Sequence, residues 1–166
     1  MTPISVDLSP LSPADLPNID KLDERAFGPG RFARTAYRLR EGGEPDYALS
    51  FVARVGTFLV GANRMTRINC GGVPGLLLGP LTVDPAFRSR GIGNALVTKS
   101  LEAAKSSGAK LVLLVGDAPY YSRMGFRPVP FGQLTFPGPV DPARFLVCEL
   151  EDGALKLAKG PVTRPI

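Results

Sequence analysis

A strand, a helix and a second strand follow one another within residues 76–115, and this unit limits the fold more than any other part of the chain. Leu76 to Val83 is a nearly all-apolar run of strand length, as expected when both faces of a strand are covered. Residues 91–107 predict a helix, because their polar side chains fall within one arc of about 140°. Gly108 ends that helix, and Leu111 to Val115 is a second apolar strand. The order predicts a βαβ unit with parallel strands and a right-handed crossover.

The flanking segments extend this unit into a mixed α/β sheet flanked by helices. At 166 residues the chain has room for one compact domain with a core, so residues 1–166 are expected to form a single domain. Gly56 joins two β-rich runs in a predicted hairpin, and Gly61 in the second run indicates a bulge. The remaining predicted elements are a strand at Ile4–Leu8, a helix begun by Ser12, Pro13 and Asp15 and running to Phe27, a helix at Arg31–Glu41, strands at Tyr47–Val55 and Thr57–Ile68, a helical turn at Tyr120–Met124 and a closing strand at Phe145–Leu150.

The chain contains no histidine, which removes Ser-His and Cys-His catalysis and most zinc and non-haem iron chemistry. No metal is therefore expected. Cys70 and Cys148 lack metal-type spacing and are predicted to be ordinary reduced cysteines. The first ten residues lack the basic start and apolar middle of a secretory signal, and Pro74 and Pro80 interrupt the most apolar run. A cytoplasmic location without a membrane partner is expected.

The turn between the first strand and the helix of the central unit carries the chemistry. It reads Val-Asp-Pro-Ala-Phe-Arg-Ser-Arg-Gly-Ile-Gly-Asn over residues 83–94 and lies at the carboxyl end of the strand, where open α/β sheets bind ligands. Gly91 and Gly93 at a helix start let backbone amides approach an anion, and the helix dipole favours negative charge there. Arg88 and Arg90 add two cations. Together these features predict a pyrophosphate cradle.

Gly91 and Gly93 could instead serve only the close packing of the helix on the strand. A dinucleotide-binding fingerprint needs a third glycine where this chain has Leu96, and a P-loop needs a glycine where it has Thr98. Both nucleotide motifs are poor fits, whereas close packing stays an alternative to the cradle.

Two motifs stand in order on either side of the predicted helix. Leu81 to Gly93 is an apolar strand, a Val-x-Pro-like turn and Arg-x-x-Gly-x-Gly at a helix start; Tyr120 to Phe126 reads Tyr-Tyr-Ser-Arg-Met-Gly-Phe. Both segments resemble signatures of the GNAT superfamily of acetyl-CoA-dependent N-acetyltransferases, closest to a compact bacterial branch. The resemblance covers Leu76–Arg127 strongly and the flanks loosely. It implies a GNAT-like α/β (α+β) fold in which the parallel strand pair splays apart.

The resemblance also implies roles for individual residues. The amides of Arg88 through Asn94 would hold the pyrophosphate of CoA, and the Leu81 and Val83 main chain would pair with the pantetheine arm. The Leu81 amide would polarise the thioester carbonyl, and Tyr121 falls on the family's general acid, a phenol that stays protonated at neutral pH. The implied catalytic residues are Tyr121 and Leu81, and the implied cofactor-binding residues are Leu81, Thr82, Val83, Arg88, Ser89, Arg90, Gly91, Ile92, Gly93, Asn94, Asp117, Tyr120, Tyr121 and Arg123.

Several of these residues have alternative roles. Tyr121 could be a half-buried packing residue, and Arg123 could solvate the short helix instead of touching a phosphate. Asp117 could cap the helix, contact the cofactor or act as a base. The group that deprotonates the incoming amine is open among Glu24, Asp46, Asp84, Asp117 and water.

The implied reaction is direct acetyl transfer from acetyl-CoA to a primary amine of a small molecule or peptide through a ternary complex. The resemblance is also compatible with a homodimer. The alternative function is a non-catalytic acyl-CoA-binding regulatory module, which would not need Tyr121. A net charge of +5 also suits nucleic acid, but the basic residues are dispersed and no stacking motif occurs, so no nucleic-acid partner is expected.

Acceptor choice is expected to lie with the N-terminal helices and the Pro-rich segment Phe131–Pro139. Arg31, Arg34, Arg38 and Arg40 favour an acidic or phosphorylated acceptor if they face the cleft. The alternative is a solvated basic helix face.

Overall fold

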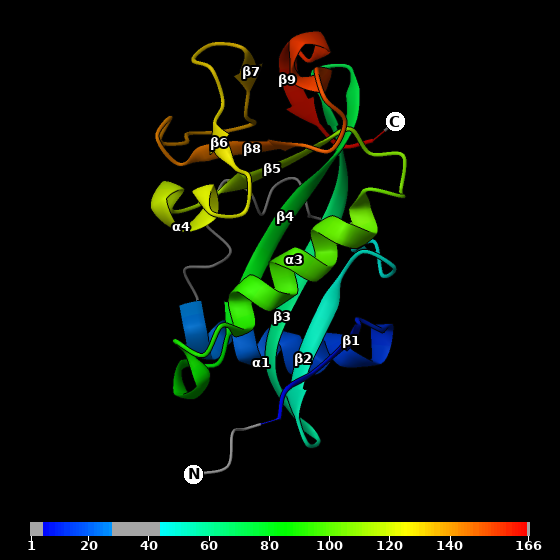
Figure 1. Cartoon of the computed structure of the whole chain (residues 1–166), viewed down its shortest axis with the longest axis vertical. Coiled ribbons are helices and arrows are strands. Elements are labelled where there is room, and N and C mark those ends of the chain that lie inside the picture. The colour runs from blue at the N-terminus through cyan, green and yellow to red at the C-terminus, as the bar shows by residue number, and fades with distance from the viewer. Residues whose placement is uncertain (1–4, 28–43, 166) are drawn as a thin grey trace.

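The structure is a computed structural model that describes residues 5–27 and 44–165, so the predicted helix at 31–41, its arginines and Ile4 lie outside the described residues. The strands are β1 (Asp7–Pro10), β2 (Phe51–Val55), β3 (Phe58–Cys70), β4 (Val73–Val83), β5 (Leu111–Val115), β6 (Arg127–Pro128), β7 (Leu134–Thr135), β8 (Phe145–Glu149) and β9 (Gly160–Thr163) (Figure 1). The helices are α1 (Leu16–Phe27), α3 (Ile92–Ala104) and α4 (Ala118–Ser122), with single 3-10 turns η1 (Pro13–Asp15), η3 (Pro85–Phe87) and η4 (Ala154–Leu157).

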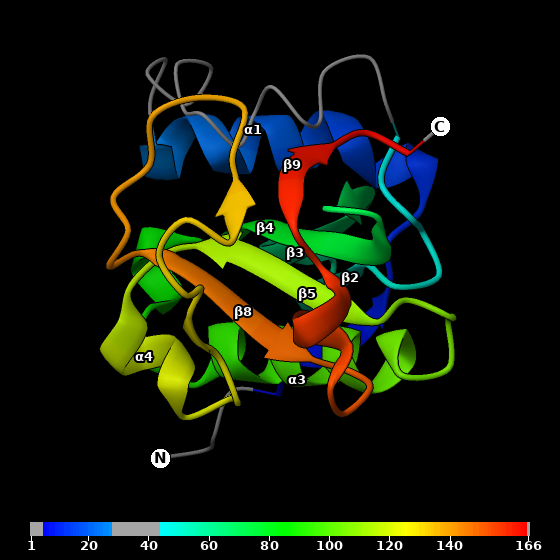
Figure 2. The ribbon, with the colours of Figure 1, turned by 90° about the horizontal axis from the view of Figure 1, so that it is seen from above.

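One mixed sheet organises these elements, in the order β1-β2-β3-β4-β5-β8-β6. The β4–β5 pair is parallel, and the other neighbours along this path are antiparallel. β9 pairs with the end of β3 and with β7. Helix α1 lies on one side of the sheet, and α3 and α4 lie on the other (Figure 2). The predicted α/β fold with a central parallel pair is confirmed.

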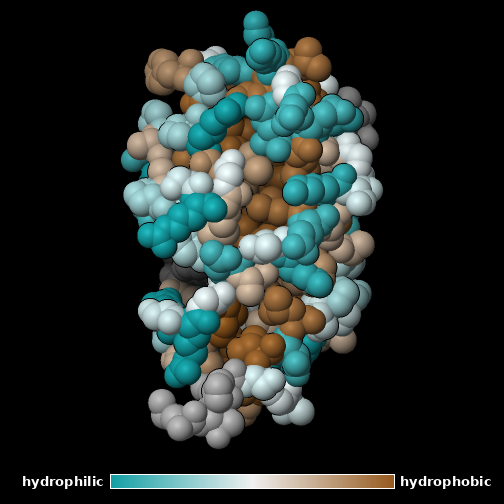
Figure 3. Space-filling model, in the orientation of Figure 1, coloured by the Kyte–Doolittle hydropathy of each residue, from teal (hydrophilic) through white to brown (hydrophobic). Residues whose placement is uncertain are grey.

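The core lies between the sheet and the helices on its two faces. Leu76, Val97, Val112 and Leu146 are fully buried between α3 and the sheet, because every second residue of a strand points to the same face. On the other face, Ile19 of α1 packs into a separate cluster. The predicted polar arc of α3 is exposed, and polar side chains spread over this side of the molecule (Figure 3). It comprises Asn94, Thr98, Lys99, Glu102, Lys105 and Ser106.

Local sequence signals located the turn that leads into α1 and the β2–β3 hairpin, although Pro13–Asp15 form the 3-10 turn η1 and α1 itself begins at Leu16. The backbone N–H of Ser12 donates to the Asp15 carboxylate at 3.0 Å, which caps the turn leading into α1. Gly56 turns the hairpin with a φ of 60°. Pairing then passes from Ala53 opposite Gly61 to Arg54 opposite Leu59, so the bulge predicted at Gly61 is confirmed.

Several predicted boundaries are wrong. β1 covers Asp7–Pro10 instead of Ile4–Leu8. β2 begins at Phe51 and not at Tyr47, because the Leu49 amide donates to the Asp46 carbonyl and closes a turn. α3 ends at Ala104 and not at Ser107, whose hydroxyl bonds the Ala104 carbonyl at 2.6 Å. α4 starts two residues earlier than expected.

The sequence predicted that the strand at 145–150 is the last element. This prediction is wrong, because β9 follows it. Pro161 within β9 cannot donate to a ladder, which explains why this segment does not look like a strand in the sequence. Cys70 and Cys148 are free thiols, as predicted. Within the described ranges, α1, α3 and α4 all fall short of the length and apolarity that a bilayer-spanning helix needs.

Candidate functional site

The site lies where β4 and β5 part. β5 pairs with β4 only at Gly75–Leu77, so beyond Leu77 strand pairing joins β4 to β3 alone within the described residues. Register shifts at the same point, because Gly79 and Pro80 together stand opposite the single residue Arg64 of β3. Figure 1 shows β5 and β8 turning away from β4. Within the described residues no strand pairs with the edge of Leu81–Val83 that faces away from β3, and an extended ligand can pair with such an edge.

The turn after β4 is shaped for an anion. Ser89 has a φ of 64° and Gly91 a φ of 79°, so two residues in the left-handed region flank Arg90. Alternation of this kind directs successive amides to one side of the backbone. A left-handed φ is unfavourable for a residue other than glycine, such as Ser89. Strained backbone of this kind occurs most often at functional sites. A Cβ at Gly91 would meet nothing within 4 Å, so the space beside this backbone is open.

Arg88 and Arg90 at this turn, and Arg123 at the end of α4, differ from five other arginines of the described ranges. Arg25, Arg54, Arg64, Arg67 and Arg127 each form an ion pair with a carboxylate. Exposed Arg88, Arg90 and Arg123 form none within residues 5–27 and 44–165. The guanidinium of Arg90 lies 5.8 Å from the ring centroid of Phe87, a cation–π distance that holds it beside the turn. Unpaired guanidinium groups beside converging amides suit a phosphate-bearing ligand.

Gly93 has a different reason to be glycine. A Cβ there would stand 2.9 Å from the Tyr120 hydroxyl and 3.7 Å from side-chain atoms of Leu81 and Val83. Close packing, the alternative left open by the sequence, therefore applies to Gly93. It does not apply to Gly91, whose surroundings are open.

Three comparisons with known proteins agree with this geometry. The sequence profile of the acetyltransferase (GNAT) domain matches residues 46–128. This chain belongs to the GNAT acetyltransferase family. The uncharacterized N-acetyltransferase YhbS of Escherichia coli (strain K12) is 30% identical over 152 residues, 90% of each chain. The uncharacterized N-acetyltransferase YjhQ of the same strain is 32% identical over 130 residues, 76% of this chain and 71% of that protein.

Solved structures extend the likeness to the whole GNAT fold. The crystal structure of Escherichia coli YhbS in complex with CoA matches with a TM-score of 0.82 and 27% identity, covering 99% of this chain and 92% of that one. A GNAT family acetyltransferase from Brucella melitensis in complex with acetyl-CoA gives a TM-score of 0.62 and 28% identity, covering 86% and 95%. The predictions of family, fold and an acyltransferase enzyme are thereby confirmed.

In this GNAT acetyltransferase Tyr121 is a partly buried phenol. Its ring covers Gly116 and stacks edge-on against Tyr120 at 4.9 Å and Phe126 at 5.8 Å between centroids. The pKa of Tyr121 is raised to about 12, mainly by burial and to a smaller extent by nearby Tyr120 and Asp117, while Arg144 acts in the opposite direction. The hydroxyl makes no hydrogen bond within the described part of the chain. Tyr121 thus packs against its neighbours, and its hydroxyl stays protonated at neutral pH.

The carboxylates considered as bases are differently placed. Asp117 stands at the N-cap of α4, but its side chain makes no capping hydrogen bond; only its carbonyl accepts, from the Tyr121 amide. Asp117 therefore holds the N-cap position, as expected of a helix cap, but the prediction that its side chain makes the cap is wrong. Asp84 binds Arg25 at 3.2 Å and the Ala86 amide at 3.0 Å. Glu24 is exposed.

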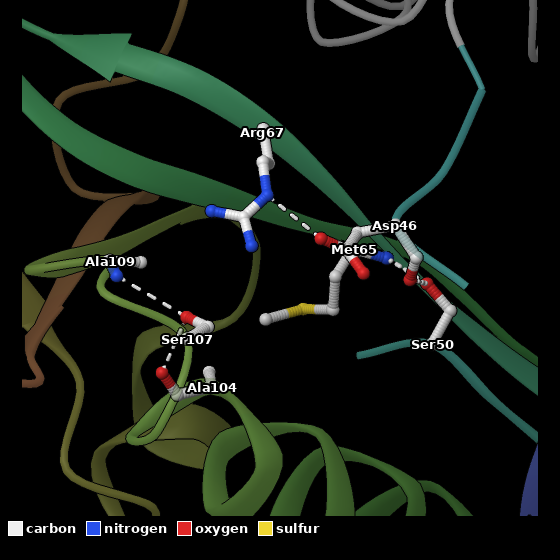
Figure 4. A network of polar contacts seen from close by, with 7 residues as sticks. All are labelled: Asp46, Ser50, Met65, Arg67, Ala104, Ser107 and Ala109. Atoms are coloured by element: carbon white, nitrogen blue, oxygen red, sulfur yellow. Dashed lines mark hydrogen bonds and ion pairs between the residues drawn. The ribbon is translucent and has the colours of Figure 1, made fainter. Parts of the chain in front are cut away.

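Asp46 is also engaged, as Figure 4 shows. Its carboxylate accepts from Arg67 Nε at 2.8 Å, and its carbonyl accepts from the Ser50 hydroxyl at 2.8 Å. The Ser50 oxygen in turn accepts from the Met65 amide at 2.9 Å. This network ties the turn before β2 to β3, which is a structural role.

The structure shows where the side chains of three implied cofactor-binding residues lie: Thr82, Ile92 and Asn94. The Thr82 side chain points to the α1 face, where its hydroxyl donates to Asp23 Oδ1 at 2.6 Å. Ile92 is the first residue of α3, and its side chain is buried in the core. Only the main chain of these two residues can reach a ligand. The Asn94 side chain accepts from the Thr98 hydroxyl at 3.2 Å and stays exposed.

Asp23 and Arg144 are residues that the sequence did not single out. Asp23 follows Ile19 and Leu22 at helical spacing, so it falls on the buried face of α1, and a carboxylate on such a face was an available signal. Arg144 had no such signal. It comes to the site because its carbonyl accepts from the Gly116 amide at 2.9 Å, at the end of β5.

Proposed function

We propose that this chain is an N-acetyltransferase that moves an acetyl group from acetyl-CoA directly to a primary amine of a small molecule or peptide. Both substrates bind together, in one domain over residues 1–166. The observation that carries the proposal is the open, cationic turn at 88–91, which leads from the one-sided half of β4 into α3. CoA and acetyl-CoA in the YhbS and Brucella melitensis structures support this choice of donor.

In this proposal the turn and β4 bind the donor. The amides of Arg88 through Asn94 hold the diphosphate, and Arg88 and Arg90 supply the balancing charge. Main-chain groups of Leu81, Thr82 and Val83 pair with the extended arm as an added strand would. We assign the remaining donor contacts to residues at and beside α4, where exposed Arg123 provides a further cation; they are Asp117, Tyr120, Tyr121 and Arg123.

The chain's own groups then act on the reacting centre. Acetyl-CoA supplies an activated thioester carbonyl. The Leu81 amide donates to the oxygen of that carbonyl and stabilises negative charge as the amine attacks. Tyr121 donates a proton to the departing sulfur, which its raised pKa allows because the phenol stays protonated throughout the neutral range. The proton that the amine nitrogen loses passes to water, and water returns a proton to Tyr121. Holding both substrates in register supplies much of the remaining acceleration.

The runner-up is a regulatory module that binds acyl-CoA without turnover. A donor hydroxyl at Tyr121 without a hydrogen-bond partner within the described residues favours the enzyme, since a sensor would not need it. The cytoplasmic location, the homodimer and the absence of a metal or nucleic-acid partner stay predictions.

Calorimetry with acetyl-CoA and a thiol-release assay over a panel of primary amines test the proposal. We expect micromolar acetyl-CoA binding and thiol release that depends on the amine. Binding without release across the panel would favour the regulatory module. Binding to duplex DNA in place of acetyl-CoA would contradict both functions.

A further inference from the structure

The segment of β4 that carries the proposed donor contacts is held by an unusual set of contacts. Beyond Leu77, strand pairing joins β4 to β3 alone within the described residues, and the register shift at Gly79 and Pro80 interrupts that pairing. Pro80 has no backbone N–H to donate. Residues 81–83 pair again with residues 61–63 of β3, but on one edge only, so their side chains add to what fixes their orientation.

Those side chains anchor the segment on both faces of the sheet. On the α3 face, Leu81 and Val83 pack against the first turn of the helix, each 3.7 Å from the Cβ position of Gly93. On the α1 face, the Thr82 hydroxyl donates to Asp23 Oδ1 at 2.6 Å. Thr82 is 1% exposed and Asp23 5% exposed, so this hydrogen bond is shielded from water.

The partner of Thr82 is itself fixed. Asp23 Oδ2 accepts from the Arg64 guanidinium of β3 at 2.6 Å, so one carboxylate joins α1, β3 and β4. Hydrogen bonds to a charged acceptor are shorter and stronger than neutral ones. A buried hydroxyl left without a partner is costly, so Thr82 can satisfy this bond only when β4 holds the observed rotation.

We propose that Asp23 and Thr82 are positioning residues that aim the main chain of Leu81 and Val83 at the acyl donor. The inference rests on the proposed function. Anchoring of α1 does not require this contact, since Ile19 and Leu22 are fully buried and Arg25 separately binds Asp84. The hydrogen bond instead fixes the rotation of β4 at the residue between the two proposed donor contacts.

The test compares Thr82→Val, which keeps the shape of the side chain but removes the hydroxyl, with Thr82→Ser, which keeps the hydroxyl. Ser100→Ala is the matched control, because it breaks the buried Asn63–Ser100 hydrogen bond of 3.0 Å on the other face of the same sheet. The readouts are hydrogen exchange of the peptide spanning residues 79–83, acetyl-CoA affinity, kcat and Tm. Should the valine variant not fold, Thr82→Ala leaves room for a water molecule beside Asp23.

We expect Thr82→Val to speed exchange at 79–83 and to lower kcat roughly 10- to 100-fold, the cost of a small misplacement of reacting groups. Thr82→Ser should recover most of both losses. Ser100→Ala should lower Tm without changing kcat or exchange at 79–83.

Wild-type exchange and kcat in Thr82→Val would overturn the proposal. So would a Tm loss that leaves kcat as in Ser100→Ala, because the contact would then be structural only. The exchange measurement needs no acetyl-CoA, so it tests the positioning even if the chain fails to bind that donor and the proposed function falls.

Discussion

The hydroxyl oxygen of Tyr120 lies 2.9 Å from the point that a Cβ on Gly93 would occupy. This contact joins α4 to the first turn of α3 across the gap between β4 and β5. It also separates the two glycines of the motif: Gly93 makes room for a side chain of the protein, whereas Gly91 leaves open space.

The first prediction concerns this contact. Alanine is favoured over glycine inside a helix by about 0.5–1 kcal/mol, but in the wild type a methyl group at position 93 must displace the Tyr120 hydroxyl. Gly93→Ala should therefore stabilise the chain in a Tyr120→Phe background and not in the wild type. Urea unfolding of the four proteins of this cycle measures the difference. Equal effects in both backgrounds would show that the two residues do not interact.

The second prediction isolates the role of Gly91. Gly91 and Gly56 both have positive φ and open space at the Cβ position, so Gly91→Ala and Gly56→Ala should each cost about 1–2 kcal/mol of stability. Only Gly91→Ala should also weaken acetyl-CoA binding, measured by calorimetry, because its methyl group enters the proposed diphosphate space. Equal acetyl-CoA affinity in the two variants would remove Gly91 from the binding site.

The third prediction concerns proton donation. Tyr121→Phe keeps the ring contacts with Tyr120 and Phe126 but removes the hydroxyl, so kcat should fall about a hundredfold while acetyl-CoA affinity hardly changes. Steady-state kinetics with calorimetry separate the two quantities. Wild-type turnover would leave Tyr121 a packing residue only.

The fourth prediction is a loss of stability in alkali. The pKa of Tyr121 is raised from 10.0 to about 12 by burial, so between these pH values the unfolded chain releases a proton that the folded chain keeps. The contribution of the protonated Tyr121 phenol to the free energy of unfolding is fully present below pH 10 and is lost as pH rises towards 12. Unfolding free energies over this range should fall more steeply for wild type than for Tyr121→Phe. The buried Cys70 thiol, raised from 9.0 to about 12, adds to the fall in both proteins alike.

Much of the site could be predicted from the sequence because its signals are local. Apolar runs and helical periodicity placed β4, α3 and β5, and the glycine and arginine pattern located the turn between them. The left-handed φ at Gly91 is a property of the local backbone, and glycine is the residue that adopts it most readily. Such features depend on residues that are close together in the sequence.

The remaining features depend on residues far apart in the chain. Thr82 and Asp23 are 59 positions apart, and only the packing of α1 on the sheet brings them together. Neither Pro161 nor its neighbours indicate β9, which forms because the end of β3 offers a free edge. Arg144 reaches the site through the pairing of β8 with β5. Periodicity and spacing do not encode contacts of this kind.

The central claim is that the amides of residues 88–94, with Arg88 and Arg90, hold the diphosphate of acetyl-CoA. A crystal structure of the chain grown with acetyl-CoA tests it most directly. The account predicts diphosphate oxygens within hydrogen-bond distance of these amides, with the arm lying along Leu81–Val83. A diphosphate bound elsewhere, with the turn at 88–91 making no contact to it, would contradict the account.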